Sequence, residues 1–154
     1  QLLRMLIEVV SKGGNLLLNV GPTGRGEFDE RALQRLRGMG EWMRRHARSI
    51  YGCTAAEAGV PTPKDCRLTW NPQTNRLYVH IFAWPYKQLS LDGLAGKVEY
   101  AQLLNDASEV FLHEPSAQQM EMGGADAGAV TLDLPVERPN VDIPVVELFL
   151  KSNR

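Results

Sequence analysis

The sequence predicts an α+β protein in which a helix–strand–helix unit precedes an antiparallel β-sandwich. The first observation is a continuous apolar run at residues 16–18 between glycine-rich turns, which is typical of a strand covered on both faces. The second is the pair of amphipathic segments that flank this run. The third is a change of apolar period from 3.6 to 2 beyond the linker at 59–63, which predicts short strands of a sandwich.

The first helix and the first strand are expected at the start of the chain. Gly13 follows the helix as a residue that can adopt a positive φ, and Asn15–Val20 is then predicted to be a buried strand. A parallel strand needs neighbours that the rest of the chain does not supply. We therefore expect this unit to be the last piece of a larger α/β domain whose earlier part precedes Gln1. The helix is predicted from apolar residues at helical spacing: Leu2, Leu3, Leu6, Val9 and Val10.

The segment from Phe28 to Gly52 is predicted to be one amphipathic helix. Asp29 is a favourable N-cap, and Glu30 suits the positively polarised start of the helix. Gly40 is expected to let the helix approach a neighbour closely. The predicted buried face comprises Leu33, Leu36, Gly40, Met43, Ala47 and Ile50.

The remainder of the chain predicts seven short strands separated by turn signals such as Asp92-Gly93 and Asn71-Pro72. Regular short strands of this kind favour an antiparallel sandwich over a parallel sheet. The strands are expected near 67–70, 76–84, 88–91, 97–104, 108–114, 129–134 and 145–151.

Composition and charge exclude several function classes. The 154 residues carry a net charge of −1, which gives no electrostatic footprint for nucleic acid. No apolar run approaches the roughly 18 to 20 residues that span a bilayer. Cys53 and Cys66 are expected to be unpaired thiols, and a disulfide across the linker is the alternative that the sequence does not exclude. No metal site and no cofactor are expected, since His46, His80 and His113 lack ligand spacing.

Several motifs in combination resemble one known family. The stretch Ser11–Thr23, SKGGNLLLNVGPT, is followed by a helix with Gly40-x-Trp42 and then Ser49-Ile-Tyr-Gly52. This combination resembles the C-terminal part of family 29 α-L-fucosidases. Asn75–Pro85, NRLYVHIFAWP, is similar to a strand of that family's sandwich, and residues 98–104 and 130–135 fit later strands. Residues 46–49, His-Ala-Arg-Ser, depart from the family's Asn-Gly-Glu-Ala/Ser, which puts in doubt any salt bridge of that Glu.

The resemblance implies an architecture and an activity. Residues 1–52 would be the last helix–strand–helix of a (β/α)₈-like barrel, 53–66 a linker and 67–154 a C-terminal β-sandwich. The intact protein would be a retaining α-L-fucosidase that hydrolyses terminal α-L-fucose from glycans, with its Asp nucleophile and Glu acid/base upstream of the matched region. No catalytic residue is then expected in this chain, and the chain alone is expected to be inactive. Its partners would be the missing barrel portion and a fucosylated glycan. Assembly into a homo-oligomer is an alternative that the sequence does not exclude.

Asn19 is the candidate substrate-binding residue. Active sites of barrels surround the C-terminal ends of the strands, where Asn19 would lie. Its amide could contact the sugar or tie down a neighbouring loop, and both roles stay open. The nearby Gly21-x₄-Gly26 has the spacing of a phosphate loop but lacks the Lys that such a loop needs.

A rival hypothesis is a non-catalytic carbohydrate-binding or scaffolding β-sandwich module. Trp84-Pro85-Tyr86 could form a sugar-stacking platform, although such aromatic residues more often pack at a sandwich edge. His80 is expected on the outer face of the sandwich or at the interface between the two parts.

Overall fold

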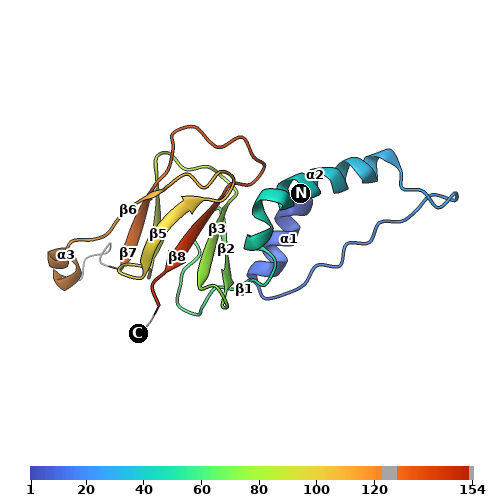
Figure 1. Ribbon diagram of the computed structural model, residues 1–154. Helices are drawn as coiled ribbons and strands as arrows, with labels where there is room; N and C mark the ends of the chain where they lie inside the picture. The colour runs from blue at the N-terminus through green and yellow to red at the C-terminus, as the bar shows by residue number, and fades with distance from the viewer. Residues whose placement is uncertain (123–127, 153–154) are drawn as a thin grey trace.

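A computed structural model describes residues 1–122 and 128–152 of the chain (Figure 1). Helix α1 (Leu2–Ser11) and helix α2 (Glu30–His46) lie together on one side of a β-sandwich, and a 3₁₀ turn, η1 (Ala47–Ser49), follows α2. A long extended segment connects the two helices and runs away from the sandwich before it returns into α2.

All seven strands predicted from the sequence are present, and every pairing is antiparallel. One sheet has five strands in the order β1-β2-β3-β8-β5, and the other has three in the order β4-β7-β6. The structure adds strand β1 and the short helix α3 (Ala117–Met122), which the sequence did not predict. The strands are β1 (Thr54–Ala55), β2 (Cys66–Asn71), β3 (Arg76–Ile81), β4 (Gln88–Asp92), β5 (Val98–Leu103), β6 (Phe111–His113), β7 (Ala129–Asp133) and β8 (Val145–Leu150).

The main core lies between the two sheets. Side chains of a strand alternate between its faces, so every second residue of β2, β3, β5 and β8 points into this space. Leu77, Val79 and Ile81 of β3 meet Val130 and Leu132 of β7 there, and all five are almost fully buried. This alternation is the physical origin of the period-2 pattern in the sequence.

The opposite face of the five-stranded sheet is covered by the helices. Leu3, Ile7 and Val10 of α1 pack with Trp42 of α2 and with Tyr78 of β3 in a second buried cluster. Arg4 and Arg67 both lie over the ring of Phe82, at 4.4 and 5.5 Å from its centroid, and fasten the start of α1 to the end of β3. Both faces of this sheet are therefore buried, which explains why β3 reads as an almost continuous buried strand.

Helix α2 begins as the sequence predicts but packs differently. The Asp29 carboxylate accepts a hydrogen bond from the Ala32 N–H at 2.8 Å, which confirms the N-cap. The predicted close approach at Gly40 is wrong for this chain, because a Cβ there would meet nothing within 4 Å. Trp42 and His46 bury the helix instead, since only its C-terminal end reaches the sheet.

The predicted strand at Asn15–Val20 is not a strand within the described part of the chain. The segment is extended and its residues alternate between exposed and half-buried, but it pairs with no other strand. The absence of a strand here follows from the lack of neighbours. A parallel strand exists only beside its neighbours, and both sheets here are built from other residues.

A buried carboxylate connects the helical layer to the centre of the sheet. Glu147 on β8 lies directly between Tyr78 on β3 and Gln102 on β5. Its carboxylate accepts hydrogen bonds from Gln102 at 2.7 Å and from the Tyr78 hydroxyl at 3.2 Å, and it pairs with the Arg48 guanidinium at 2.8 Å. Arg48 occupies the position of the Glu in the family pattern described above, and here it supplies the positive charge that pairs with Glu147.

Candidate functional site

The extended segment carries the residue that the sequence singles out. Asn19 lies exposed in its C-terminal half, on the same side as Asn15 and Leu17, whereas the alternate residues are half-buried. Leu17 is 94% exposed, so the apolar run is bare in this chain. Among the described residues, no other candidate side chain lies against Asn19, and its role stays a prediction.

The loop that follows Asn19 is organised around one threonine. Thr23 accepts hydrogen bonds through its side chain from the N–H groups of Arg25 and Glu27, and through its carbonyl from Gly26. These N–H groups are the ones a phosphate loop would turn toward its ligand. Because they are used within the turn, the loop's geometry favours a structural connection over a phosphate cradle.

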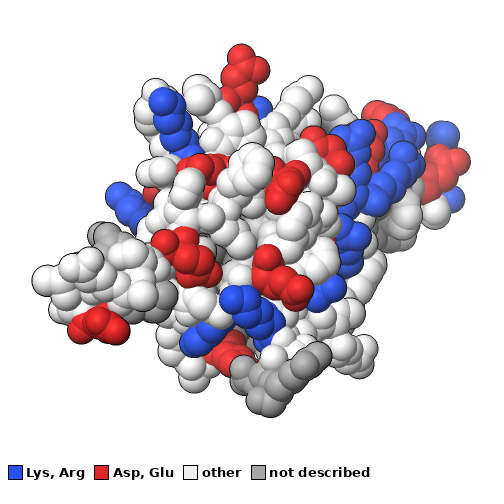
Figure 2. All heavy atoms as spheres, turned by 60° about the vertical axis from the view of Figure 1, so that its left-hand side comes forward, with Lys and Arg blue, Asp and Glu red and all other residues white. Residues whose placement is uncertain are grey.

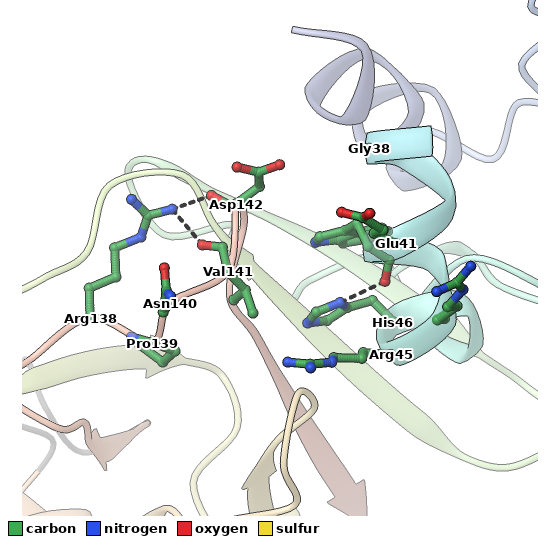
Figure 3. A pocket seen from close by; sticks show the side chains of 11 residues that line it. Gly38, Glu41, Arg45, His46, Arg138, Pro139, Asn140, Val141 and Asp142 are labelled. Carbon is green, nitrogen blue, oxygen red and sulfur yellow. Dashed lines mark hydrogen bonds between the residues drawn. The ribbon is translucent and has the colours of Figure 1, made fainter. Parts of the chain in front are cut away.

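A polar groove lies between α2 and the connection from β7 to β8 (Figure 3). Its volume is about 730 Å³. Arg138 bends back to donate hydrogen bonds to the carbonyls of Val141 and Asp142, which holds the wall of the groove formed by this connection. Three arginines and two carboxylates line the groove, which sequence reasoning missed because its two walls are about a hundred residues apart. The charged lining residues are Glu41, Arg44, Arg45, Arg138 and Asp142.

Charge is unevenly distributed over the surface although the net charge is close to zero. Helix α2 has five arginines against two glutamates. Figure 2 shows Lys and Arg gathered along the helical side of the molecule, whereas the sandwich face in that view mixes both signs. Arg37 is engaged by Glu30 at 3.1 Å on the exposed helix face. The helical layer is therefore basic on its outer side.

Two histidines are buried where α2 and η1 meet the sheet. His46 and His80 are both fully buried, and Trp42 stacks on the His46 ring with 4.6 Å between centroids. Burial lowers the pKa of His46, and it lowers the pKa of His80 to about 3 with a further contribution from the neighbouring His46. Both rings are therefore neutral at physiological pH. His80 lies at the interface between the helical layer and the sheet, one of the two positions that the sequence left open.

The two cysteines are free thiols, so the disulfide that the sequence left open is not formed. Burial raises the pKa of Cys53 and of Cys66 to about 11 in each case. A thiol is a nucleophile only as its thiolate, so neither side chain suits covalent catalysis at neutral pH.

Among residues 1–122 and 128–152, no cluster of three or more His, Cys, Asp or Glu side chains is placed to hold a metal ion. No helix in the same residues is both long and apolar enough to cross a bilayer.

Two aromatic residues are exposed in or near the three-stranded sheet: Phe111 on β6, and Tyr86 in the bend that precedes β4. Phe111 is 64% exposed and Tyr86 is 75% exposed. In the same sheet, the Asp133 carboxylate is hydrogen-bonded to His113 and to Gln88, and these two contacts lower the pKa of Asp133. Trp84 is tied down, since its Nε1 donates to the Pro135 carbonyl at 3.0 Å. Of the aromatic pair that the sequence proposed as a platform, Tyr86 is exposed, but the Lys87 ammonium lies 5.2 Å from the centroid of its ring.

Comparisons with known proteins agree on one family. The family model described as Alpha-L-fucosidase matches residues 1–48. Alpha-L-fucosidase isoenzyme 1 from Paenibacillus thiaminolyticus superposes on 99% of this chain with a TM-score of 0.83 and 37% sequence identity. The resemblance to the C-terminal part of family 29 α-L-fucosidases is therefore confirmed.

The relation to these α-L-fucosidases covers only part of their length. Human plasma alpha-L-fucosidase is 36% identical over 87 residues, which are 55% of this chain and 18% of the human protein. The Dictyostelium discoideum alpha-L-fucosidase is 26% identical over 94% of this chain and 30% of its own length. The chain thus spans about a fifth to a third of its α-L-fucosidase relatives, including 34% of the Paenibacillus structure.

Proposed function

We propose that the protein containing this chain is a retaining α-L-fucosidase that hydrolyses terminal α-L-fucose from glycans. The observation that carries this proposal is the match to a bacterial α-L-fucosidase over 99% of the chain at 37% identity. A Bacteroides thetaiotaomicron GH29 α-L-fucosidase with a similar fold has been trapped as a covalent intermediate. Retaining glycosidases pass through such an intermediate, which supports the same stereochemical course here.

In this proposal, residues 1–52 are the last helix–strand–helix of a (β/α)₈-like barrel, 53–66 are a linker and 67–154 are the accessory sandwich. Two features of the extended segment Asn15–Val20 support the barrel: its apolar character and its lack of a strand partner. Neighbouring barrel strands would pair with the backbone N–H and C=O groups of this segment, and they would also cover the exposed Leu17 side chain. The linker is not free, because β1 within it pairs with β2.

The chemistry is assigned to residues outside this chain. Retaining hydrolysis needs two carboxyl groups about 5 to 5.5 Å apart across the scissile bond. Glu27, Asp29 and Glu30 are clustered, but Asp29 caps α2 and Glu30 pairs with Arg37. This chain would therefore supply the barrel end and the sandwich, and it would be inactive alone.

The direct test uses the protein with its preceding polypeptide and an aryl α-L-fucoside. We expect release of the aryl group, with α-L-fucose as the first sugar product in a proton NMR time course. The chain by itself, at equal concentration, should release none. Failure of the longer protein to hydrolyse the substrate would refute the activity, and β-L-fucose as first product would refute retention.

Asn19 is proposed to lie at the sugar end of the barrel strand. Asn19→Ala should lower kcat/KM by about 10- to 100-fold if one hydrogen bond to the substrate or its loop is lost. Asn15→Ala is the matched control, because Asn15 lies on the same side at the far end of the segment and should leave kcat/KM within about twofold. Equal effects of the two variants would remove Asn19 from the site.

Carbohydrate binding by the sandwich is a second candidate function, favoured by exposed Phe111, which lies opposite Asp133 in the register of β6 and β7, next to the hydrogen bonds that Asp133 makes. Aromatic faces stack on sugar rings, and carboxylate, amide and imidazole groups bond hydroxyls. Titration of the chain alone with fucosylated oligosaccharides tests this function separately from hydrolysis. Binding that is lost in Phe111→Ala would support it, and no binding at millimolar ligand would exclude it.

A further inference from the structure

A continuous chain of hydrogen bonds joins the helical layer to the sheet. Trp42 Nε1 donates to the Ile143 carbonyl at 3.0 Å, and the Trp42 carbonyl meets His46 Nδ1 at 2.9 Å. The Ser49 hydroxyl donates to the His46 carbonyl at 2.7 Å, and Thr69 on β2 donates to the Ser49 carbonyl at 2.7 Å. His80 Nε2 on β3 lies 3.0 Å from the Thr69 oxygen and ends the chain. The participating side chains are almost completely buried.

This arrangement fixes the tautomer of both histidines. A carbonyl can only accept, so His46 Nδ1 must carry the proton that it shares with the Trp42 carbonyl. Thr69 has one hydroxyl proton and gives it to the Ser49 carbonyl, so its oxygen must accept from His80 Nε2–H. The lone pairs then lie on His46 Nε2 and His80 Nδ1. Both atoms are buried and have no hydrogen-bond partner among the described residues.

A second proton on either ring would therefore have to enter a buried site without an acceptor. A buried charge without a partner is strongly unfavourable, whereas the same imidazolium in water costs nothing extra. Both rings contact Trp42, with centroids 4.6 and 6.3 Å from its ring, so a charge on one imidazole disfavours a charge on the other. Both histidines oppose protonation for as long as the helices stay on the sheet.

Glu41 and Asp142 line the same groove as His46, but neither is a hydrogen-bond partner of its unpaired Nε2. The other charged groups around the two rings do not stabilise a second proton either. Arg45 on α2 acts on His46 with the same sign as an added proton. Arg67 lies opposite His80 on β2 and pairs with Glu8 of α1 at 3.1 Å. Glu147 on β8 forms an ion pair with Arg48 of η1 and accepts a hydrogen bond from Tyr78 of β3, so its charge is already paired. Cys53, the remaining titratable group near this junction, donates its thiol hydrogen to the Arg48 carbonyl.

We propose that His46 and His80 form an acid-released latch that holds α2 and η1 on the five-stranded sheet while both rings are neutral and releases them on protonation. Above about pH 6.5 both rings are neutral in the docked and undocked states, so the latch contributes fully. As pH falls below that value, the undocked state binds protons first and is favoured. With the pKa of His80 at about 3 in the docked state, this residue alone shifts the docking equilibrium roughly 30-fold toward release between pH 8 and pH 5.

Hydrogen exchange of backbone amides tests the latch at pH 7.5 and pH 5, after correction for intrinsic exchange rates. An undocked 17-residue helix is marginal in water, so the amides of α2 should lose at least about tenfold in protection at pH 5. Amides of β4 and β7 in the distant sheet should lose less than about threefold. Unchanged protection of α2 at pH 5 would overturn the proposal.

Substitution of the histidines tests whether His46 and His80 cause the loss of amide protection in α2 at pH 5. His46→Asn and His80→Gln each keep the donating N–H position but cannot be protonated, so the double variant should keep α2 protected at pH 5. His113→Gln, at the exposed third histidine, should behave as the unmodified protein. Equal acid release in the double variant would refute the latch. If the double variant does not fold, imidazole NMR of the unmodified protein decides: titration of His46 or His80 near pH 6.5 with α2 still docked contradicts it, and titration coupled to release supports it.

Discussion

Leu132 and Leu17 both lie in segments that the sequence predicts to be strands, yet the first is buried in the structure and the second is exposed. Leu132 on β7 is fully buried between β4 and β6, whereas Leu17 is 94% exposed in the extended segment. Both segments carry leucines that a sheet could bury, in a continuous run at 16–18 and alternating with polar residues at 129–134. The difference in burial follows from their neighbours: β7 lies between β4 and β6, whereas residues 15–20 pair with no strand in the described part of the chain.

The helical layer is intermediate between these two regions. The C-terminal half of α2 is anchored by Trp42 and His46, whereas its N-terminal half extends beyond the sheet with exposed or half-buried residues. Burial thus declines along the molecule from the sandwich, through the docked helix ends, to the extended segment. This gradient fits the proposal that the extended segment belongs to a barrel whose other strands would cover it.

The sharpest test of the comparison is a matched pair of leucine truncations. Leu132→Ala removes buried methyl groups between the sheets and should lower the free energy of unfolding by about 2 to 5 kcal/mol. Leu17→Ala should change it by less than about 0.5 kcal/mol, because the side chain is already in water. Urea denaturation of both variants of this chain measures the difference. A loss above about 2 kcal/mol for Leu17→Ala would show that the extended segment is buried after all.

A smaller effect is expected where the helical layer meets the sheet. Arg48→Met leaves the buried Glu147 carboxylate with only Tyr78 and Gln102 as partners, and it should cost about 1 to 2 kcal/mol. This range is below that for a fully buried ion pair because the Arg48 side chain is half exposed. Arg37→Met breaks the exposed Glu30–Arg37 pair and should cost less than about 0.5 kcal/mol. Equal costs in thermal unfolding would show that Glu147 does not depend on Arg48.

The smallest effect is expected at the free start of α2. Asp29→Ala removes the cap of the Ala32 N–H and should destabilise the first turn by about 1 kcal/mol. Amide exchange in the first turn should then accelerate several-fold, while the unfolding midpoint of the sandwich stays constant. Asp29→Asn, which keeps the accepting oxygen, should behave as the unmodified chain. A matching loss of stability in the sandwich would mean that α2 and the sandwich unfold as one unit.

Local signals predicted most of the fold. The seven strands follow from period-2 alternation and turn residues, and the N-cap of α2 follows from Asp29. The errors concern tertiary context. The periodicity placed Gly40 in the helix interface, but Trp42 and His46 form it because only the end of α2 reaches the sheet. Contacts across about a hundred residues, such as Arg48 with Glu147, carry no local signal at all.

The candidate site was less predictable than the fold. Asn19 is predicted from its place at the end of an apolar run, and no candidate side chain in the described part of the chain lies against it, so its role stays a prediction. The groove between α2 and the β7–β8 connection was missed because neither wall has a recognisable motif. The buried histidine pair was visible in the sequence only as scattered residues, since helical and strand positions meet there through folding.

Amide hydrogen exchange in Asn15–Val20 tests most directly the claim that this segment completes a barrel. The measurement compares this chain with the protein that carries the preceding polypeptide, using the amides of β8 as an internal reference. The account predicts near-intrinsic exchange in this chain alone and at least about a hundredfold slower exchange in the longer protein, with β8 equally protected in both. Fast exchange of Asn15–Val20 in both proteins, or slow exchange in this chain alone, would contradict it.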